Sequence, residues 1–336
     1  MVQVLLSGIV AMVISIVAGP KFIEFLRRNE LGQFIREEGP RAHAAKKGTP
    51  TMGGLLIMIS MAVPFLIFSD FTVPALTVFF VALGCAAIGF ADDWLKLMRR
   101  RSLGLSGRWK LLLLAGITVF VALVAERRDF KTDVYIPLAD VHVPLSYGWY
   151  VLLFVIIAGA ANGVNLTDGL DGLASGTAAF SLLTYTAMGV VAWLVSKRGG
   201  TEDVASLDLA ILGASLIGAT IGFLWYNAFP AQVFMGDTGS MGLGGALAAF
   251  AIMTKTEALL VLIGGVFLIE ALSVMLQVFF FKWKGKRILL MAPIHHHFEM
   301  KAWSETRIMV RFWIAAAIFC ASAFVLYYRY FSKFAS

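Results

Sequence analysis

Long apolar runs, separated by short polar connections, dominate this sequence. A transmembrane helix needs about 20 apolar residues to cross the hydrocarbon layer, where its backbone groups must be hydrogen-bonded within the helix. With 59% hydrophobic and only 15% charged residues, a chain of 336 residues cannot solvate its surface as a water-soluble domain. The sequence therefore predicts an all-α polytopic membrane protein, one domain over residues 1–336, with about ten transmembrane helices near 2–25, 52–69, 72–91, 110–125, 149–161, 173–195, 207–226, 240–254, 258–281 and 308–331.

Basic residues gather in alternate connections between these runs. Seventeen Lys and Arg fall in one set of loops and six in the opposite set. The positive-inside rule therefore places the first set in the cytoplasm and both termini on the extracytoplasmic side. The same asymmetry accounts for the net charge of +7, so nucleic acid is not expected as a partner. The cytoplasmic loops are 26–51, 92–109, 162–172, 227–239 and 282–307.

Two local features depart from plain helical spans. Residues 133–144, in the outer connection between the fourth and fifth spans, alternate loosely between apolar and polar, which predicts a small β-hairpin. Gly264 and Gly265 lie inside the ninth run, where they predict a bend that opens a groove for lipid.

The stretch Asn162–Ala174, N-G-V-N-L-T-D-G-L-D-G-L-A, joins two apolar runs and is unusually polar. Asp168 and Asp171 lie three apart among its glycines. Carboxylates at the edge of the hydrocarbon are costly, so their presence favours a functional site. A polar turn between two spans is the structural alternative.

Two further acidic motifs fall on the predicted cytoplasmic side. Asp92 and Asp93 are expected to end the third span, with Lys96 one turn later. Neighbouring carboxylates repel each other, so one is a candidate general base, or the two share a divalent cation. A hydrated helix end with a Lys partner is the alternative reading.

Asp237 lies in F-M-G-D-T-G-S, directly before the eighth span. An Asp or Thr there can cap the helix, and the glycines let a phosphate approach the N–H groups of its first turn. An Asp that holds magnesium at such a place suits phosphoryl chemistry. Asn227 and Phe234 can add a hydrogen bond and a stacking face for a nucleobase.

The segment Pro293–Glu299, P-I-H-H-H-F-E, carries three histidines. In an extended segment His295 and His297 share a face, whereas in a helix the three side chains fan apart. Contact with a phosphorylated substrate is favoured, with zinc binding as the alternative.

Two other candidates lie outside these clusters. H-A-A-K-K-G-T-P-T-M-G-G, residues 43–54, offers His43, Lys46 and Lys47 either as phosphate contacts or as positive-inside charges. Glu270 falls within the ninth run, where an ionisable residue is a functional candidate whose role the sequence leaves open.

The chain resembles the phospho-N-acetylmuramoyl-pentapeptide transferases, the bacterial branch of the polyprenyl-phosphate N-acetylhexosamine-1-phosphate transferase superfamily. The motifs that carry the resemblance are N-L-T-D-G-L-D-G-L-A, the D-D pair followed by Lys, G-D-T-G-S, A-P-I-H-H-H-F-E and T-P-T-M-G-G. The resemblance extends from Gly32 to about Arg311, with Met241 in place of the expected Leu after G-D-T-G-S.

The resemblance implies a reaction at the cytoplasmic face of the bacterial cytoplasmic membrane, within peptidoglycan synthesis. Phospho-MurNAc-pentapeptide passes from UDP-MurNAc-pentapeptide to undecaprenyl phosphate, which gives lipid I and UMP with Mg²⁺ as cofactor. It also implies ten helices with outward termini and is consistent with a homodimer. Direct attack by the lipid phosphate is favoured over a phospho-aspartyl intermediate, because no carboxylate stands out as a nucleophile.

The same resemblance assigns roles to residues of this chain. Asp237 becomes the magnesium ligand and Asp92 the base that deprotonates the lipid phosphate, with Asp93 beside it as a further catalytic residue. The implied substrate contacts are Lys46, Lys96, Asn165, Asp168, Asp171, Asn227, Phe234, His295, His296 and His297.

Three other functions are weighed against this one. A secondary transporter predicts polar groups near the membrane midplane and a repeat between halves, and of the candidates here only Glu270 is so placed. A structural scaffold does not require so many acidic motifs. A GlcNAc-1-phosphate transferase shares the chemistry and differs only in its sugar substrate.

Overall fold

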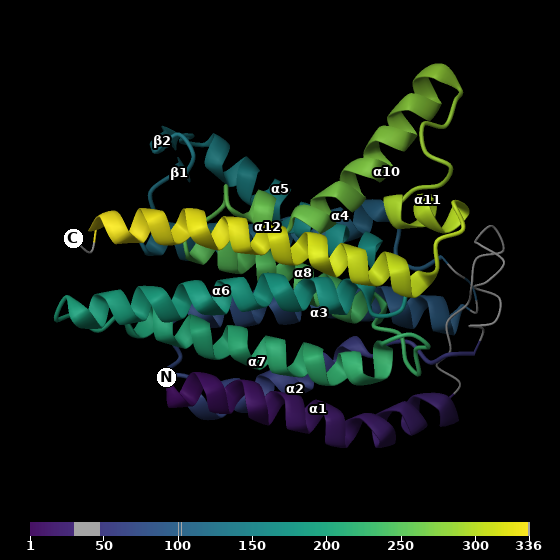
Figure 1. The fold of residues 1–336 in the computed structure, drawn as a ribbon, viewed down its shortest axis with the longest axis horizontal. Coiled ribbons are helices and arrows are strands. Elements are labelled where there is room, and N and C mark those ends of the chain that lie inside the picture. Colours follow the sequence, from purple (N-terminus) through teal and green to yellow (C-terminus); the bar gives the residue numbers. More distant parts are fainter. Residues whose placement is uncertain (30–47, 100, 102, 335–336) are drawn as a thin grey trace.

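The computed structural model describes residues 1–29, 48–99, 101 and 103–334, and the chain is mostly helical there. The long helices run side by side, with the start of α1 and the end of α12 at the same end of the bundle (Figure 1). The helices are α1 (Val2–Arg28), α2 (Gly54–Phe68), α3 (Val73–Met98), α4 (Gly107–Arg127), α5 (Gly148–Thr167), α6 (Leu173–Arg198), α7 (Val204–Asn227), α8 (Gly236–Met253), α9 (Leu260–Ile263), α10 (Gly265–Lys284), α11 (Ile294–Met300) and α12 (Glu305–Phe334).

Within the described part of the chain, eight helices are long and apolar enough to cross a membrane. This finding confirms the expectation of a multi-pass membrane protein. The predicted second and eighth spans correspond to α2, which has 15 residues, and to α8, which is buried from Thr238 to Met253. Since α8 packs inside the bundle, small residues serve it better than large apolar ones. The eight helices are α1, α3, α4, α5, α6, α7, α10 and α12 up to Arg329.

Three of the predicted span ends are wrong, and each helix continues into polar sequence. The third span was expected to end at residue 91, but α3 runs to Met98 and holds Asp92 and Asp93 inside its last two turns. Likewise α5 runs to Thr167 and α4 begins at Gly107. Apolar runs mark only the lipid-facing part of a helix, whereas these polar turns are stabilised by partners inside the protein.

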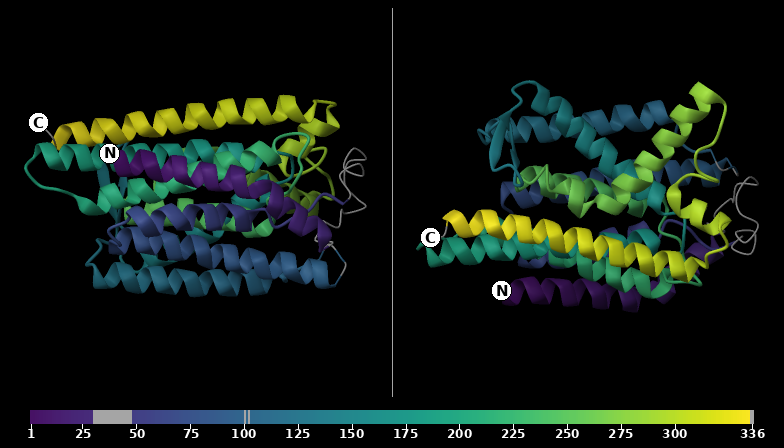
Figure 2. Two further views of the ribbon diagram at one scale, coloured as in Figure 1. Left: turned by 90° about the horizontal axis from the view of Figure 1, so that it is seen from below. Right: turned by 45° about the horizontal axis from the view of Figure 1, so that its top comes forward.

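The ninth predicted span is broken, as its two glycines suggested. α9 ends at Ile263, Gly264 interrupts the helix, and α10 starts at Gly265. From there α10 leaves the bundle at an angle, as Figure 1 and the right-hand view of Figure 2 show.

The predicted outer hairpin is present between α4 and α5. β1 (Asp133–Ile136) pairs antiparallel with β2 (Val141–Pro144), so that Val134 lies opposite Val143. The ammonium of Lys255, just after α8, donates to the carbonyl oxygens of Lys131 at 2.8 Å and Asp133 at 2.7 Å. These bonds fasten the hairpin to the end of the bundle.

Glycines allow α8 to approach its neighbours closely. A Cβ on Gly89 of α3 would lie 2.0 Å from the carbonyl oxygen of Asp237, and one on Gly244 of α8 would lie 2.4 Å from that of Ala160. Small residues at such contacts let helix backbones touch, which is the main source of packing energy between helices in lipid.

Gly244→Ala should therefore destabilise the protein, because its Cβ forces α5 and α8 apart. Overpacking of this kind costs about 1–3 kcal/mol, which should appear as a lower melting temperature in detergent. Gly159→Ala, on α5, is the matched control, since no atom outside its local backbone lies within 4 Å of the added Cβ. Equal melting temperatures for the two variants would contradict this packing.

Candidate active site

Three carboxylates meet where the last turns of α3 lie against the first turn of α8. Asp92 and Asp93 come from α3 and Asp237 from α8, and one oxygen of each lies within 4.8 Å of the others. Asp92 and Asp93 are buried, whereas 15% of the Asp237 side chain is exposed. Residues 144 positions apart in sequence thus form one acidic cluster that is reached from outside through Asp237.

Asp93 holds the beginning of α8 in place. Its Oδ1 accepts from the backbone N–H of Asp237 at 3.2 Å, and its Oδ2 accepts from the N–H and hydroxyl of Thr238 at 3.0 and 2.8 Å. The first N–H groups of a helix have no partner within it and carry a partial positive charge. The buried carboxylate therefore caps α8 from a neighbouring helix and fixes the position of Asp237.

Two lysines balance most of the acidic charge. Lys96 Nζ lies 3.0 Å from Asp237 Oδ1 and also contacts Asp92 and Asp93. Lys110 Nζ lies 2.6 Å from Asp237 Oδ2 and 3.1 Å from Asp92 Oδ1. Three carboxylates against two ammonium groups leave a net negative site, which favours a cation.

Sequence reasoning missed Lys110 altogether. It precedes the run L-L-L-L in the first turn of α4 and resembles a charge that flanks a span. A lysine so close to apolar residues, rather than in the loop before them, was the available signal. Its acidic partners lie on two other helices.

The polar stretch from residue 162 onwards forms the turn between α5 and α6, beside the cluster. Withdrawal from water, followed by the charges of Asp237, Asp93 and Asp171, raises the pKa of Asp168 well above its usual range. A raised pKa favours the protonated carboxyl, which can donate a hydrogen bond. The structure thus brings Asp168 and the cluster together, although they are distant in sequence.

Other predicted contacts in this region have protein partners. The amide of Asn227 accepts from the N–H of Gly172 at 3.2 Å and the hydroxyl of Ser175 at 2.8 Å, and donates to the carbonyl of Val233 at 3.0 Å. Asn227 therefore joins the turn to the loop before α8.

Two more predicted residues hold the loop before α8 and the beginning of α8 itself. Asp171 accepts from the N–H of Ala231 at 3.0 Å, and Asn165 donates to Ser240 Oγ at 3.0 Å. Both contacts lie beside the start of α8, so these side chains help to shape the site.

Phe234 anchors the T-P-T-M-G-G segment through its backbone. Its N–H donates to the carbonyl of Pro50 at 2.8 Å, and its carbonyl accepts from Gly53 at 2.9 Å. Phe234 is partly exposed. Lys46, His43 and Lys47 lie outside the residues that the structure describes.

The three histidines lie on the helix α11 and fan apart, as expected for a helical segment. His295 is fully buried with its Nδ1 3.1 Å from Oε1 of the equally buried Glu270. His296 pairs with Glu299, and Nδ1 of His297 accepts from the N–H of Leu290 at 3.1 Å. Glu270 therefore has a partner in α11, and its role is tied to His295.

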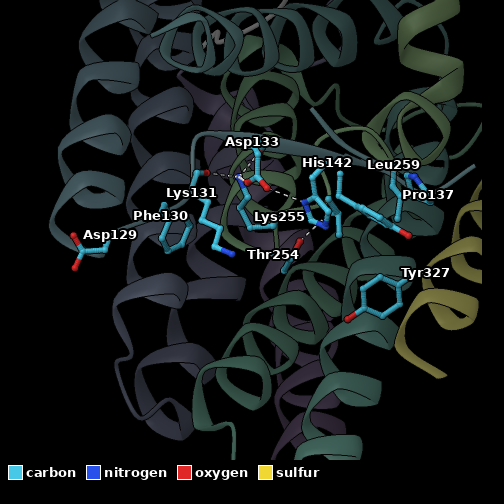
Figure 3. A pocket seen from close by; sticks show the side chains of 12 residues that line it. Asp129, Phe130, Lys131, Asp133, Pro137, His142, Thr254, Lys255, Leu259 and Tyr327 are labelled. Carbon is cyan, nitrogen blue, oxygen red and sulfur yellow. Dashed lines mark hydrogen bonds and ion pairs between the residues drawn. The ribbon is translucent and has the colours of Figure 1, made fainter. Parts of the chain in front are cut away.

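A separate pocket lies at the opposite end of the bundle, beside the hairpin (Figure 3). It encloses about 440 Å³ and is lined by residues of the hairpin, the α8–α9 turn and α12, among them Asp133, His142 and Lys255. Asp133 Oδ2 lies 2.8 Å from His142 Nδ1, and Lys255 bonds to the hairpin backbone. Because these charges are used to hold the hairpin, the acidic cluster is the stronger candidate for catalysis.

Lys110→Gln should destabilise the protein, because it leaves the buried Asp92 and the largely buried Asp237 with one ammonium partner fewer. Breaking a buried ion pair costs about 3–5 kcal/mol, and the loss should be visible as a lower melting temperature without divalent cations. Added Mn²⁺ should then raise the melting temperature of this variant more than that of the unmodified chain. Lys110→Arg is the charge-conserving control. An unchanged melting temperature in Lys110→Gln would contradict the assigned ion pairs.

Comparison with known proteins agrees with the geometry. The model of glycosyl transferase family 4 matches residues 75–255, and phospho-N-acetylmuramoyl-pentapeptide-transferase signature 1 matches residues 46–58. Curated relatives with that transferase name include those of Geobacillus sp. (strain WCH70), 46% identical over 318 residues and 94% of each chain. That of Bacillus subtilis (strain 168) is 45% identical over 319 residues, covering 94% of this chain and 95% of the relative.

A third relative covers still more of the chain. The transferase of Rubrobacter xylanophilus is 44% identical over 335 residues, which is 98% of each chain. The similarity therefore extends over nearly the whole length of the chain. The chain therefore belongs to the phospho-N-acetylmuramoyl-pentapeptide-transferases, within glycosyl transferase family 4.

Proposed function

We propose that this transferase moves phospho-MurNAc-pentapeptide from UDP-MurNAc-pentapeptide to undecaprenyl phosphate, which yields lipid I and UMP for peptidoglycan synthesis. The observation that carries the proposal is the cluster of Asp92, Asp93 and Asp237 with Lys96 and Lys110. It combines acidic groups for a metal and a proton with cationic groups for phosphate oxygens. Membership of the family supplies the substrates.

The cluster fits magnesium. Mg²⁺ prefers oxygen ligands at about 2.1 Å, so two opposite ligands stand roughly 4.2 Å apart. The three carboxylate oxygens lie within 4.8 Å of one another, which is compatible with that spacing after small side-chain shifts. Asp237 is the favoured ligand, because it is the most exposed and both oxygens of Asp93 are used to cap α8. Bound magnesium would neutralise charge on the diphosphate and on the departing UMP.

Residues of the chain itself accept the proton and hold the phosphate groups. Asp92 takes the proton of the lipid phosphate, whose oxygen then attacks the phosphorus attached to the sugar. That bond forms as the bond from the same phosphorus to the bridging oxygen breaks, and UMP leaves with the electron pair. Lys96 and Lys110, which lie between Asp92 and Asp237, hold phosphate oxygens during the transfer. Attack is direct, with no phospho-aspartyl intermediate.

The remaining candidates surround the nucleotide and sugar. Asp168 donates a hydrogen bond to the nucleotide, and the Phe234 ring stacks on uracil. Asp171 and Asn227 act by holding the loops around these groups, and Asn165 holds the beginning of α8. Lys46, His296 and His297 contact the substrate, whereas the buried His295 supports α11 through Glu270.

The membrane arrangement follows from the same proposal. The cluster lies at the end of the bundle that the positive-inside rule assigns to the cytoplasm, so both termini face outward. With α2 and α8 as crossing segments, and α9 and α10 as one, the chain crosses the bacterial cytoplasmic membrane ten times. The bend at Gly264 opens a groove for the polyprenyl tail, and the protein forms a homodimer.

Asp237→Asn and Asp92→Asn should each lower the rate of UMP release about 10³-fold or more, because each removes charge at the reacting phosphates. The assay uses purified protein in detergent with undecaprenyl phosphate, UDP-MurNAc-pentapeptide and Mg²⁺. Asp203→Asn is the matched control, since Asp203 caps α7 at the other end of the bundle and Asn caps helices as well. Retained activity in Asp237→Asn would refute the assigned site.

Substrate choice tests the reaction itself. Turnover should occur with UDP-MurNAc-pentapeptide and not with UDP-GlcNAc, both measured as UMP release. Turnover of UDP-GlcNAc would instead assign the GlcNAc-1-phosphate transfer reaction to the same site. UMP formation from neither, by protein shown to be folded, would contradict both.

A further inference from the structure

The far end of α10 stands apart from the other helices, at the same end of the bundle as α11 (Figures 1 and 2). The buried residues of α10 are Gly265, Val266, Phe267, Glu270 and Ser273. Beyond Ser273 the helix has no buried residue, and its exposed side chains include Met275, Leu276, Val278, Phe279, Phe281 and Trp283. An apolar helix in this position is surrounded by lipid rather than by protein.

The last residues of α10 and the loop that follows, Lys282–Leu290, form what we term the α10 tip. It carries four basic residues, and the sequence from Ala271 to Phe298 has no acidic residue. Within the described residues, no ion pair joins these four cations to a carboxylate. The ammonium of Lys284 lies over the Trp283 ring, 4.6 Å from its centre. The cations are Lys282, Lys284, Lys286 and Arg287, and all are exposed.

The tip has a fixed shape. The chain reverses at Gly285, whose φ of +66° suits glycine, and returns along α10. The side chain of Gln277 accepts from the N–H groups of Ile288 at 3.1 Å and Leu289 at 3.0 Å, and donates to the carbonyl of Leu289 at 3.1 Å. This clamp leaves the side chains of Ile288 and Leu290 48% and 51% exposed, beside the cations.

This combination matches the interface of an anionic bilayer. Trp and Lys at the end of a lipid-facing helix lie at the level of the headgroups, and basic clusters attract anionic lipids there. A soluble anion would satisfy the four charges but would leave Ile288 and Leu290 in water. We propose that the α10 tip is a binding surface for anionic phospholipid headgroups, with Trp283, Ile288 and Leu290 seated in the interfacial layer.

The α10 tip is also connected to α11, the helix that carries the three histidines. The backbone N–H of Leu290 donates to Nδ1 of His297 at 3.1 Å, so the clamped loop and α11 form one continuous support. A headgroup bound at the tip is therefore connected to His297 through this loop. The binding surface itself depends on membrane insertion and not on the transferase reaction.

The test uses a fluorescent label at the tip of the full-length protein in lipid nanodiscs. Ile288→Cys can be labelled selectively with an environment-sensitive dye, since Cys85 and Cys320 are buried. Brominated phosphatidylglycerol should quench this label about twofold more than the same fraction of brominated phosphatidylcholine, because anionic lipid gathers at the tip. High salt should reduce the excess.

Substitutions at the four cations test whether the excess quenching depends on their charge. Glutamine at Lys282, Lys284, Lys286 and Arg287 should abolish the excess quenching, whereas exchanging Lys for Arg and Arg for Lys at the same positions should keep it. A label at Val151, which is 65% exposed in the first turn of α5 at the other end of the bundle, should show no preference between the lipids.

Three results would overturn the proposal: equal quenching of the tip label by both lipids, an excess that survives in the glutamine variant, or an excess that millimolar UMP removes. The last would make the surface part of the nucleotide site. Because quenching needs no turnover, an inactive protein in the UMP assay leaves this test intact. Gel filtration and the charge-conserving variant show that loss of the excess is not a loss of folding.

Discussion

The contact between Asp93 and the N-terminus of α8 is the one on which the rest of the site depends. A buried carboxylate accepts two backbone N–H groups and a hydroxyl, which offsets the loss of its hydration. The contact is possible because Gly89 brings the backbone of α3 against that of α8. Asp237, the first acidic residue of α8, is thereby fixed beside Asp92, so one cap determines the geometry of the whole acidic cluster.

The charges around that cap explain why the cluster can persist at the edge of a membrane. Isolated buried charges are strongly destabilising, whereas paired ones are tolerated when their hydrogen bonds are also satisfied. Lys96 and Lys110 contact carboxylates of both helices and leave the site with one excess negative charge. Glu270 and His295 form a second buried pair, with His295 Nδ1 3.1 Å from Glu270 Oε1. Under the proposed function, the paired charges supply the polar centre that a nucleotide and a lipid phosphate require.

Much of the architecture could be predicted from the sequence, because a segment that crosses lipid must be a long apolar helix whose backbone groups are hydrogen-bonded to each other. The apolar runs located the helices, the two glycines located the break before α10, and the alternation in residues 133–144 located the hairpin. The three aspartates of the cluster were also identified, since acidic residues at the ends of apolar runs are costly.

What could not be predicted was which of those polar groups pair with each other. Lys110 resembled a flanking charge until α4 was placed against α3, and Asn227 resembled a ligand for a base until its amide was found between two loops. The partner of Glu270 is another example, because Glu270 and His295 are on separate helices. These pairings depend on helix packing, which hydropathy does not encode.

The most direct test of the central claim is the anomalous diffraction of Mn²⁺ in crystals grown with Mn²⁺ and the nucleotide substrate. If the cluster is the metal centre of phosphoryl transfer, the anomalous peak should lie within about 2.2 Å of a carboxylate oxygen of Asp237, next to the diphosphate. A peak at the histidines of α11, or an ordered nucleotide with no metal at Asp237, would contradict the account.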